Sequence, residues 1–280
     1  MSDSSNPLSK YFRTPKIYIK LPSEGKWYPE GVYEQTPTGE IPVYGMTAKD
    51  ELLLKTPDAL FSGQSTVDVI HSCVPNIKNA WAMPSVDVDA VLIAIRQATY
   101  GNEMEFTSVC PHCESKNESA VDLGVLFTRI VAPDYKQNLK VQGLEFIFRP
   151  NTFKDINNES QQAYHQQKIL SVVLDENLSE ADKSARFSKM FTDLLDVTVQ
   201  QVASSVAGIK TEDGAMVQDP VHIHDFFKNC EKPVWEAARG HLEKIVSTLA
   251  TKNIDLTCDN EECQKSYTSP LLFEQSSFFG

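Results

Sequence analysis

Hydrophobic and polar positions change their period several times along the 280-residue chain. Residues 16–21 alternate between apolar and polar side chains, which predicts a strand. Residues 41–44 predict a second short strand, at a sheet edge because Pro42 has no backbone N–H to donate. Residues 1–15 show little periodicity and are rich in Ser, Asn and Asp, so we expect them to form a flexible arm.

Helical periods follow the two strands. Thr47 is expected to cap a helix over 49–54, whose first turn carries acidic side chains. Ser65 or Thr66 is expected to start the next helical stretch, over 67–74, because both side chains can accept hydrogen bonds at a helix N-terminus.

A longer helix is predicted after Pro84–Ser85, with Gly101 as its C-terminal cap. Its apolar residues recur at helical spacing: Val88, Val91, Leu92 and Ile95. From 152–251 the pattern is again helical, interrupted by a loop at Gly208 and 211–214. One apolar stripe in this stretch is assigned to the hydrophobic core: Phe187, Met190, Phe191, Leu194 and Leu195.

Strand character appears again in the middle and at the end of the chain. Residues 104–128 have it around a pair of cysteines, and 140–148 predicts a hairpin with its turn at Gln142–Gly143. The last thirty residues return to strand. The sequence therefore predicts an α+β fold that is predominantly helical, with a β-rich N-terminal segment.

Composition narrows the class of protein. Hydrophobic residues make up 41% of the chain, as in globular proteins, and no apolar run approaches the ~20 residues that span a bilayer. The N-terminal residues lack the apolar core of a signal peptide. A net charge of −12 argues against a nucleic-acid partner. We therefore expect a cytosolic chain that binds neither a membrane nor nucleic acid.

Four of the six cysteines form two pairs with similar flanks. Cys110 and Cys113 enclose two residues, and Cys258 and Cys263 enclose four. Strand-like segments precede and follow each pair: 104–107, 120–123, 254–257 and 270–273. A strand, a tight cysteine turn and a second strand are the layout of a zinc knuckle.

A tetrahedral zinc site needs four soft or borderline ligands, and this spacing lets one tight turn present two thiolates. Two knuckles packed together predict one structural Zn²⁺ per chain, held by Cys110, Cys113, Cys258 and Cys263. Structural zinc of this type supplies ~10–16 kcal/mol of apparent binding free energy, which is coupled to folding.

The gap between the two pairs sets the domain organisation. A compact zinc ribbon separates its pairs by about fifteen to twenty residues, whereas 144 residues separate Cys113 from Cys258. We therefore expect residues 104–128 and 252–280 to be two halves of one zinc-ribbon-like β element. A large helical insertion, 129–251, splits them, and a β/helical region, 16–103, precedes them.

Redox catalysis is one alternative for the first pair. Cys-Pro-His-Cys is also the active-site sequence of strongly oxidising thiol-disulfide oxidoreductases. That chemistry needs a helix that starts at the motif, and residues 114–119 show no amphipathic helix. It also leaves the second pair unexplained.

Three further interpretations of the cysteines stay open. A disulfide framework is disfavoured because nothing marks the chain as secreted. Four reduced thiols without a metal are the simplest alternative. His112 can replace one cysteine as a metal ligand, although four thiolates are the simpler set.

The remaining candidates for chemistry are weak. Cys73 and Cys230 lie in apolar helical contexts and are expected to be buried, inert thiols. His222 and His224 can chelate a metal from a strand, but the residues beside them have helical character. The sequence carries no phosphate loop, dinucleotide fingerprint, metalloprotease motif or nucleophile elbow. We therefore expect that the protein is not an enzyme.

A longer pattern covers the N-terminal third: Leu21-Pro22-Ser23-x-Gly25-x-x-Tyr28-Pro29, Gly39-Glu40-Ile41-x-Val43 and Met46-Thr47-Ala48-x-Asp50-Glu51-x-Leu53-Leu54-x-Thr56-Pro57-Asp58-Ala59-Leu60-x-x-Gly63. It resembles the start of the baseplate hub proteins of T-even-like contractile-tailed bacteriophages. Further matching segments are the two cysteine pairs, a helical segment Ile209-Lys210-Thr211-x-Asp213-Gly214 and Phe273-Glu274-x-x-Ser277-Phe278-Phe279. The similarity is spread over most of residues 16–280.

That resemblance implies a structural or assembly component of the viral baseplate hub, in the virion tail and in the host cytoplasm during assembly. Its partners would be other hub and tail proteins, with the tape-measure protein a further candidate. The zinc ribbon would be a rigid clip, and the helical insertion would offer surfaces to neighbouring tail proteins. Two alternatives stay open: a tail-assembly chaperone absent from the mature virion, and a zinc-ribbon protein that binds nucleic acid.

Overall fold

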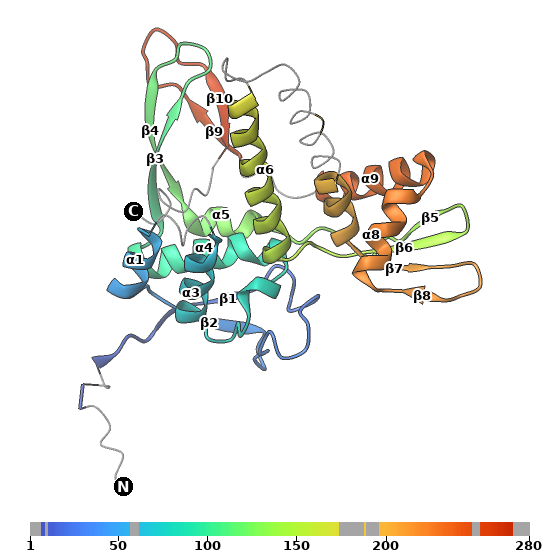
Figure 1. Cartoon of the computed structure of the whole chain (residues 1–280). Coiled ribbons are helices and arrows are strands. Elements are labelled where there is room, and N and C mark those ends of the chain that lie inside the picture. Colours follow the sequence, from blue (N-terminus) through green and yellow to red (C-terminus); the bar gives the residue numbers. More distant parts are fainter. Residues whose placement is uncertain are drawn as a thin grey trace. The chain divides into compact units, whose positions relative to one another are not determined.

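The computed structural model describes residues 7–8, 11–56, 62–173, 188, 196–247 and 253–270 (Figure 1). Contacts group the chain into two compact units, the first made of residues 1–80, 87–130 and 250–280, the second of 81–86 and 131–249. Helices and small antiparallel sheets make up both units, which confirms the mixed α+β class. Of the described helices, none combines the length and apolar character needed to cross a membrane.

The first unit holds three two-stranded antiparallel sheets and four helices among its described residues. The first two residues of α4 are grouped with the second unit. In chain order its elements are β1 (Pro15–Lys20), β2 (Glu40–Tyr44), α1 (Ala48–Leu54), α3 (Gln64–Cys73), α4 (Ser85–Tyr100), β3 (Glu103–Val109), β4 (Lys116–Asp122), α5 (Leu123–Arg129), β9 (Asn253–Thr257) and β10 (Ser266–Pro270).

Several local predictions in this unit are confirmed. β1 and β2 form where strands were predicted, and they pair with each other, with Ile19 opposite Ile41 and both side chains buried. Thr47 caps α1, and its side chain and that of Asp50 form a reciprocal capping box. α4 ends at Tyr100, and Gly101 follows it with φ 95° and donates its N–H to the carbonyl of Gln97 at 3.0 Å.

The predicted start of α3 is wrong. The helix begins one residue earlier than Ser65, at Gln64, and its N-cap is Gly63 with φ 76°. Ser65 and Thr66 lie inside the first turn and are buried, so their hydroxyls do not cap the helix. Instead, Gly63 occupies the N-cap in a left-handed conformation, which glycine adopts more easily than residues with a Cβ.

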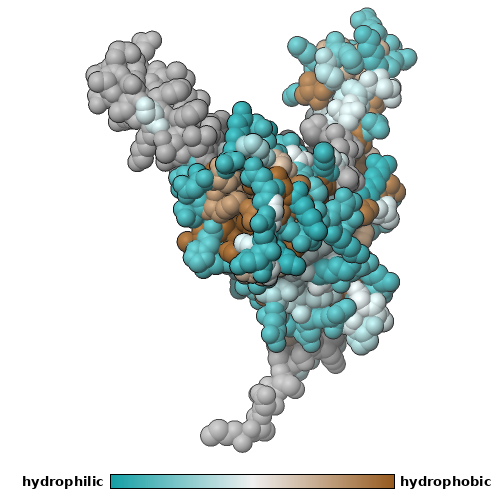
Figure 2. All heavy atoms as spheres, turned by 90° about the vertical axis from the view of Figure 1, so that its right-hand side faces the viewer, coloured by the Kyte–Doolittle hydropathy of each residue, from teal (hydrophilic) through white to brown (hydrophobic). Residues whose placement is uncertain are grey.

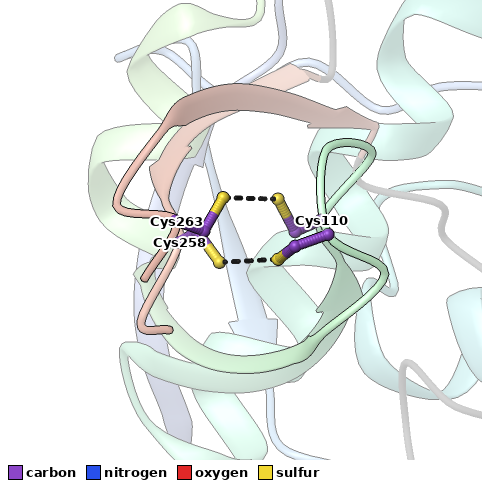
Figure 3. Close-up of side chains that lie close together, drawn as sticks. Cys110, Cys258 and Cys263 are labelled. Carbon is purple, nitrogen blue, oxygen red and sulfur yellow. Dashed lines mark hydrogen bonds between the residues drawn. The ribbon is translucent and has the colours of Figure 1, made fainter. Parts of the chain in front are cut away.

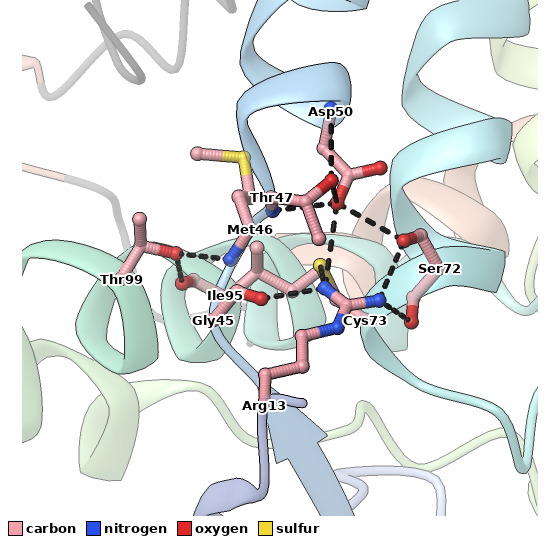
Figure 4. Close-up of polar contacts among 9 residues, drawn as sticks. All are labelled: Arg13, Gly45, Met46, Thr47, Asp50, Ser72, Cys73, Ile95 and Thr99. Carbon is pink, nitrogen blue, oxygen red and sulfur yellow. Dashed lines mark hydrogen bonds and ion pairs between the residues drawn. The ribbon is translucent and has the colours of Figure 1, made fainter. Parts of the chain in front are cut away.

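Arg13 fastens the chain before β1 to the helices of the first unit (Figure 4). Its guanidinium donates to the carbonyl of Gly45 at 2.6 Å and to the carbonyl and hydroxyl of Ser72, both at 2.7 Å. It also pairs with the buried carboxylate of Asp50 at 3.3 Å. One planar cation thereby satisfies acceptors from three separate segments.

The second unit packs helices on a four-stranded antiparallel sheet of order β5-β6-β7-β8. Residues 196–204 are also helical. The other elements of this unit, apart from the start of α4, are α6 (Phe153–Val173), α8 (Pro220–Asn229), α9 (Lys232–Ser247), β5 (Leu139–Val141), β6 (Leu144–Phe148), β7 (Val206–Lys210) and β8 (Met216–Val217), and a 3₁₀ turn, Ala80–Ala82, leads into it.

Aromatic side chains join this sheet to its helices. Phe146 and Phe148 of β6 are almost fully buried. The Phe146 ring centroid lies 5.9 Å from that of Phe227 in α8, and the Phe148 centroid lies 5.1 Å from that of His241 in α9. Figure 2 shows one face of the molecule, with hydrophobic side chains gathered near its centre and hydrophilic ones around them.

Two predictions, one in each unit, need correction. Residues 206–217 form the hairpin β7–β8 rather than a helix and loop, so 129–251 is not wholly helical. Residues 123–129 form α5 rather than continuing a strand, because Asp122 caps the helix by accepting from the N–H groups of Gly124 and Val125. The predicted turn at Gln142–Gly143 is confirmed, with both residues at positive φ.

Some predictions fall outside the described residues. They concern the apolar stripe from 187 to 195 and the strand-like and aromatic positions from 271 to 280.

Candidate metal centre

Each cysteine pair lies in the turn of an antiparallel hairpin, with β3 and β4 flanking the first pair and β9 and β10 the second. The two turns share one backbone pattern. Cys110 donates its N–H across the hairpin to the carbonyl of Ser115 at 3.0 Å, and Cys258 does the same to Lys265 at 3.0 Å. The matched flanks in the sequence therefore correspond to matched hairpins.

A left-handed residue follows the second cysteine of each pair. Glu114 adopts φ 60° and Gln264 adopts φ 44°. This conformation reverses the chain within the turn, and it costs free energy in residues that carry a Cβ. The strained residue occupies the same position in both hairpins, just before the second strand.

The two hairpins lie side by side and bring the four sulfur atoms together (Figure 3). The Cys110 and Cys263 Sγ atoms are 3.9 Å apart, and the Cys113 and Cys258 Sγ atoms are 3.5 Å apart. All four Sγ atoms lie within 4.8 Å of one another. We call these four residues the cysteine cluster.

These distances fit a tetrahedral metal ion. Four thiolates at 2.3 Å from zinc are separated from one another by about 3.8 Å, and the measured separations lie on both sides of that value. A disulfide needs an S–S distance of about 2.05 Å, and the described cysteines are all free. The cluster can therefore bind a metal ion.

The cluster is packed rather than open. Cys110 and Cys258 are 0% and 2% exposed, and Tyr267 of β10 covers them. Leu256 of β9 packs against the same group. Burial keeps water from Cys110 and Cys258, whereas Cys113 and Cys263 remain partly exposed. A hydrophobic shell of this kind controls solvent access to a metal site.

Three side-chain hydrogen bonds join the hairpins around the cluster. The hydroxyls of Ser108 and Tyr267 are 2.7 Å apart. The Asp259 N–H donates to the side-chain oxygen of Asn117 at 2.7 Å, and the Asn260 amide donates to the hydroxyl of Ser115 at 3.0 Å. The sequence pattern did not identify these partners, because short polar residues in turns have many other uses.

The thiols of the cluster differ in acidity. Hydrogen bonding with Ser115 lowers the pKa of Cys113 to about 6, whereas burial raises the pKa of Cys258 to about 12. At neutral pH the protein alone therefore does not hold all four as thiolates. A bound divalent cation would supply the charge that stabilises them together.

The structure disfavours the redox interpretation of the first pair. Residues 110–115 form a turn that leads directly into β4, so no helix N-terminus lies at the motif to acidify a thiol. The His112 side chain is exposed, and it is not among the described residues that group with the sulfur atoms. Its backbone N–H donates to the Cys110 sulfur at 3.5 Å.

Other sequence candidates lie away from any grouped ligands among the described residues. Cys73 is buried in α3 as expected, while Cys230 at the end of α8 is only half-buried. His222 and His224 lie in α8, which confirms the helical expectation. His71 accepts the N–H of Ala80 at 3.0 Å, and burial lowers its pKa, so it serves the packing of α3.

Comparison with known families identifies the chain. The family model described as T4 bacteriophage base plate protein matches residues 14–280. The chain belongs to this family. Neither the curated proteins nor the solved structures gave a match. A T4-like baseplate protein resides in the virion tail and interacts with other tail proteins, so family membership confirms the general role that the resemblance implied.

Proposed function

We propose that this T4-like baseplate protein is a structural or assembly component of the baseplate hub and has no enzymatic activity. Its membership of the baseplate family, over residues 14–280, is the observation that supports this proposal. Its partners would be other hub proteins and the tape-measure protein. It would meet them in the host cytoplasm during assembly and reside with them in the tail baseplate.

One structural zinc ion is part of this proposal, with Cys110, Cys113, Cys258 and Cys263 as its ligands. The sulfur separations and the shielding of the cluster support it. Residues 104–128 and 252–280 would then be halves of one zinc-ribbon-like element, split by residues 129–251. Binding of the ion would stabilise the folded state and hold the two hairpins together.

Charge around the cluster argues against a nucleic-acid partner. The described parts of the two hairpins carry two exposed lysines, Lys116 and Lys265. Their exposed acidic residues are Glu103, Glu105, Glu114, Glu118, Asp122, Asp255, Asp259, Glu261 and Glu262. A surface of this sign repels phosphates, whereas nucleic-acid binding depends on a concentration of positive charge.

The zinc site is tested by elemental analysis of the purified full chain. We expect about one zinc per chain, and the loss of it in Cys110→Ser and in Cys258→Ser because each removes a ligand. Cys73→Ser and Cys230→Ser are matched controls that should keep the metal, since neither sulfur belongs to the cluster. A folded wild-type protein without metal, or metal-replete ligand variants, would overturn the zinc proposal.

The hub role is tested by quantitative mass spectrometry of purified virions and by cryo-electron microscopy of the tail tip. We expect a fixed copy number in the virion and density at the centre of the baseplate. Presence in assembly intermediates but absence from virions would show that the protein is an assembly chaperone and not a hub subunit. Density confined to the periphery of the baseplate would refute the hub position.

A further inference from the structure

A cavity of about 570 Å³ lies within the second unit and has no part in the cysteine cluster. Residues of α6, of the helical segment 196–204 and of α9 contribute to its walls. Its volume falls in the range of about 300–1,000 Å³ that is typical of ligand sites. It is therefore large enough for a side chain or a small molecule.

One part of the cavity wall is apolar. Ile156 of α6 and Leu242 and Val246 of α9 line it, and Ile156 and Val246 remain 39% and 40% exposed. Exposed apolar residues beside a hollow provide a surface on which an aliphatic chain can pack. The folded protein leaves part of this surface exposed.

The polar wall carries a half-buried carboxylate, Glu159. Its two oxygens lie 3.5 Å from the Asn151 amide nitrogen and 3.4 Å from the Gln201 amide nitrogen. Both distances exceed the usual 2.7–3.2 Å for such hydrogen bonds. Burial raises the pKa of Glu159 to about 7, and the nearby charge of Asp155 acts in the same direction. The charge of Glu159 is thus poorly compensated.

The second carboxylate of the wall is already paired. Glu243 accepts from the Arg239 side chain at 2.8 Å. None of the described residues that line the cavity is basic, and no ion pair to Glu159 occurs in the described part of the chain. Among the described residues, Glu159 therefore has no cationic partner that would offset the cost of burying its charge.

We infer that this cavity receives a lysine or arginine side chain of a partner protein, whose cationic head pairs with Glu159 while its stem packs on Ile156, Leu242 and Val246. Basic side chains combine an aliphatic stem with a charged head, which matches the two kinds of wall. A metal ion fits less well, because the cysteine cluster is the one described group with three or more grouped ligands. The inference rests on the proposed function only in taking the partner to be a tail protein.

Nuclear magnetic resonance tests the inference with a matched pair of probes. N-acetyl-arginine amide and N-acetyl-citrulline amide have the same shape, but citrulline carries a neutral urea in place of the guanidinium. We expect saturable shifts of the Ile156 and Val246 methyl signals with the arginine probe and at least tenfold weaker binding of the citrulline probe. Glu159→Gln should weaken arginine binding at least tenfold. Glu236→Gln, exposed on α9 and outside the cavity, should not.

Equal binding of the two probes, or unchanged arginine binding by Glu159→Gln, would overturn the inference. Titration with 1,4-diaminobutane separates a protein side chain from a free amine. Tighter binding of the diamine than of the arginine probe would assign the cavity to a diffusible ligand and refute the partner side chain. Virion stoichiometry and zinc content test the proposed function separately, so either proposal can fail without the other.

Discussion

Ser23 donates both its backbone N–H and its hydroxyl to the carboxylate of Asp87, 64 positions further along the chain. The first bond measures 2.8 Å, and the Tyr28 hydroxyl adds a third donor at 2.9 Å. Asp87 is 0% exposed and lies in the first turn of α4. The buried carboxylate thus ties the loop after β1 to the helix, and it gives a structural role to two residues of the N-terminal sequence pattern.

Removal of one donor should measurably destabilise this buried site. Tyr28→Phe should lower the free energy of unfolding by about 1–3 kcal/mol, because a charged acceptor loses one of its donors. Asp87→Ala should lower the free energy of unfolding by about 3 kcal/mol or more, because all three donors lose their acceptor. Denaturant unfolding measures both. Tyr18→Phe, on an exposed side chain of β1, should stay within about 0.5 kcal/mol of wild type.

Arg13 should be equally sensitive to substitution. Arg13→Ala leaves the Gly45 and Ser72 carbonyls without this donor and Asp50 without its cation, so we expect a loss of about 2–4 kcal/mol. Arg13→Lys should recover less than half, because a single ammonium cannot reproduce the planar fork. Lys16→Ala, at an exposed position of β1, serves as the control in thermal unfolding. Full recovery by lysine would contradict the role of the fork.

Local signals predicted the elements whose causes lie within a few residues. The Thr47 cap, the Gly101 cap and the Gln142–Gly143 turn depend only on neighbouring backbone, so the sequence contains the whole explanation. The cysteine cluster was also predictable, because two similarly flanked pairs imply one shared site even across 144 residues.

Features that depend on distant partners were not predictable in this way. Residues 206–210 form a strand because they pair with β6, more than fifty residues earlier, although the surrounding sequence is helical in pattern. From the sequence alone, Asp87 is an ordinary acidic residue in the first turn of a helix. Only the fold places Ser23 and Tyr28 against it. Glu159 likewise becomes unusual only through the burial that the fold imposes.

The left-handed residues of the cysteine hairpins predict a stabilising substitution. Glu114→Gly should raise the free energy of unfolding of the metal-loaded protein by about 0.5–1 kcal/mol, because relief of backbone strain exceeds the added freedom of the unfolded chain. Gln264→Gly should act in the same direction. Glu118→Gly, in the extended strand β4, should instead destabilise by about 0.5–1 kcal/mol. Calorimetry distinguishes these outcomes, and destabilisation by Glu114→Gly would contradict the argument.

Glu159 should impose a pH dependence on stability. Its folded pKa is raised from 4.5 to about 7, so the folded state holds this proton more tightly than the unfolded state. The favourable contribution is present below about pH 4.5 and is lost as the pH rises to about 7. Glu159→Gln should therefore match wild type in acid and be more stable at pH 8 by about 1–2 kcal/mol, with solvent screening taken into account.

Denaturant titrations between pH 4 and pH 8 measure this difference, with Glu236→Gln as the control that keeps the wild-type profile. A constant difference between Glu159→Gln and wild type across the range would show that Glu159 titrates alike in the folded and unfolded states. Carbon-13 signals of the Glu159 carboxylate measure its pKa directly, and a midpoint near 4.5 would contradict the expected shift.

The separation of the two cysteine hairpins sets an order on biosynthesis. The ribosome synthesises Cys113 before Cys258. At ordinary rates of about 5–20 residues per second, the interval is roughly 7–30 s. During that interval only half of the cluster exists, and a nascent chain cannot complete the shell of four sulfur atoms. A chain whose synthesis stops before residue 258 lacks the second pair altogether, and one that stops between 258 and 262 lacks its second cysteine. Closure of the cluster therefore distinguishes chains translated through residue 263 from shorter ones.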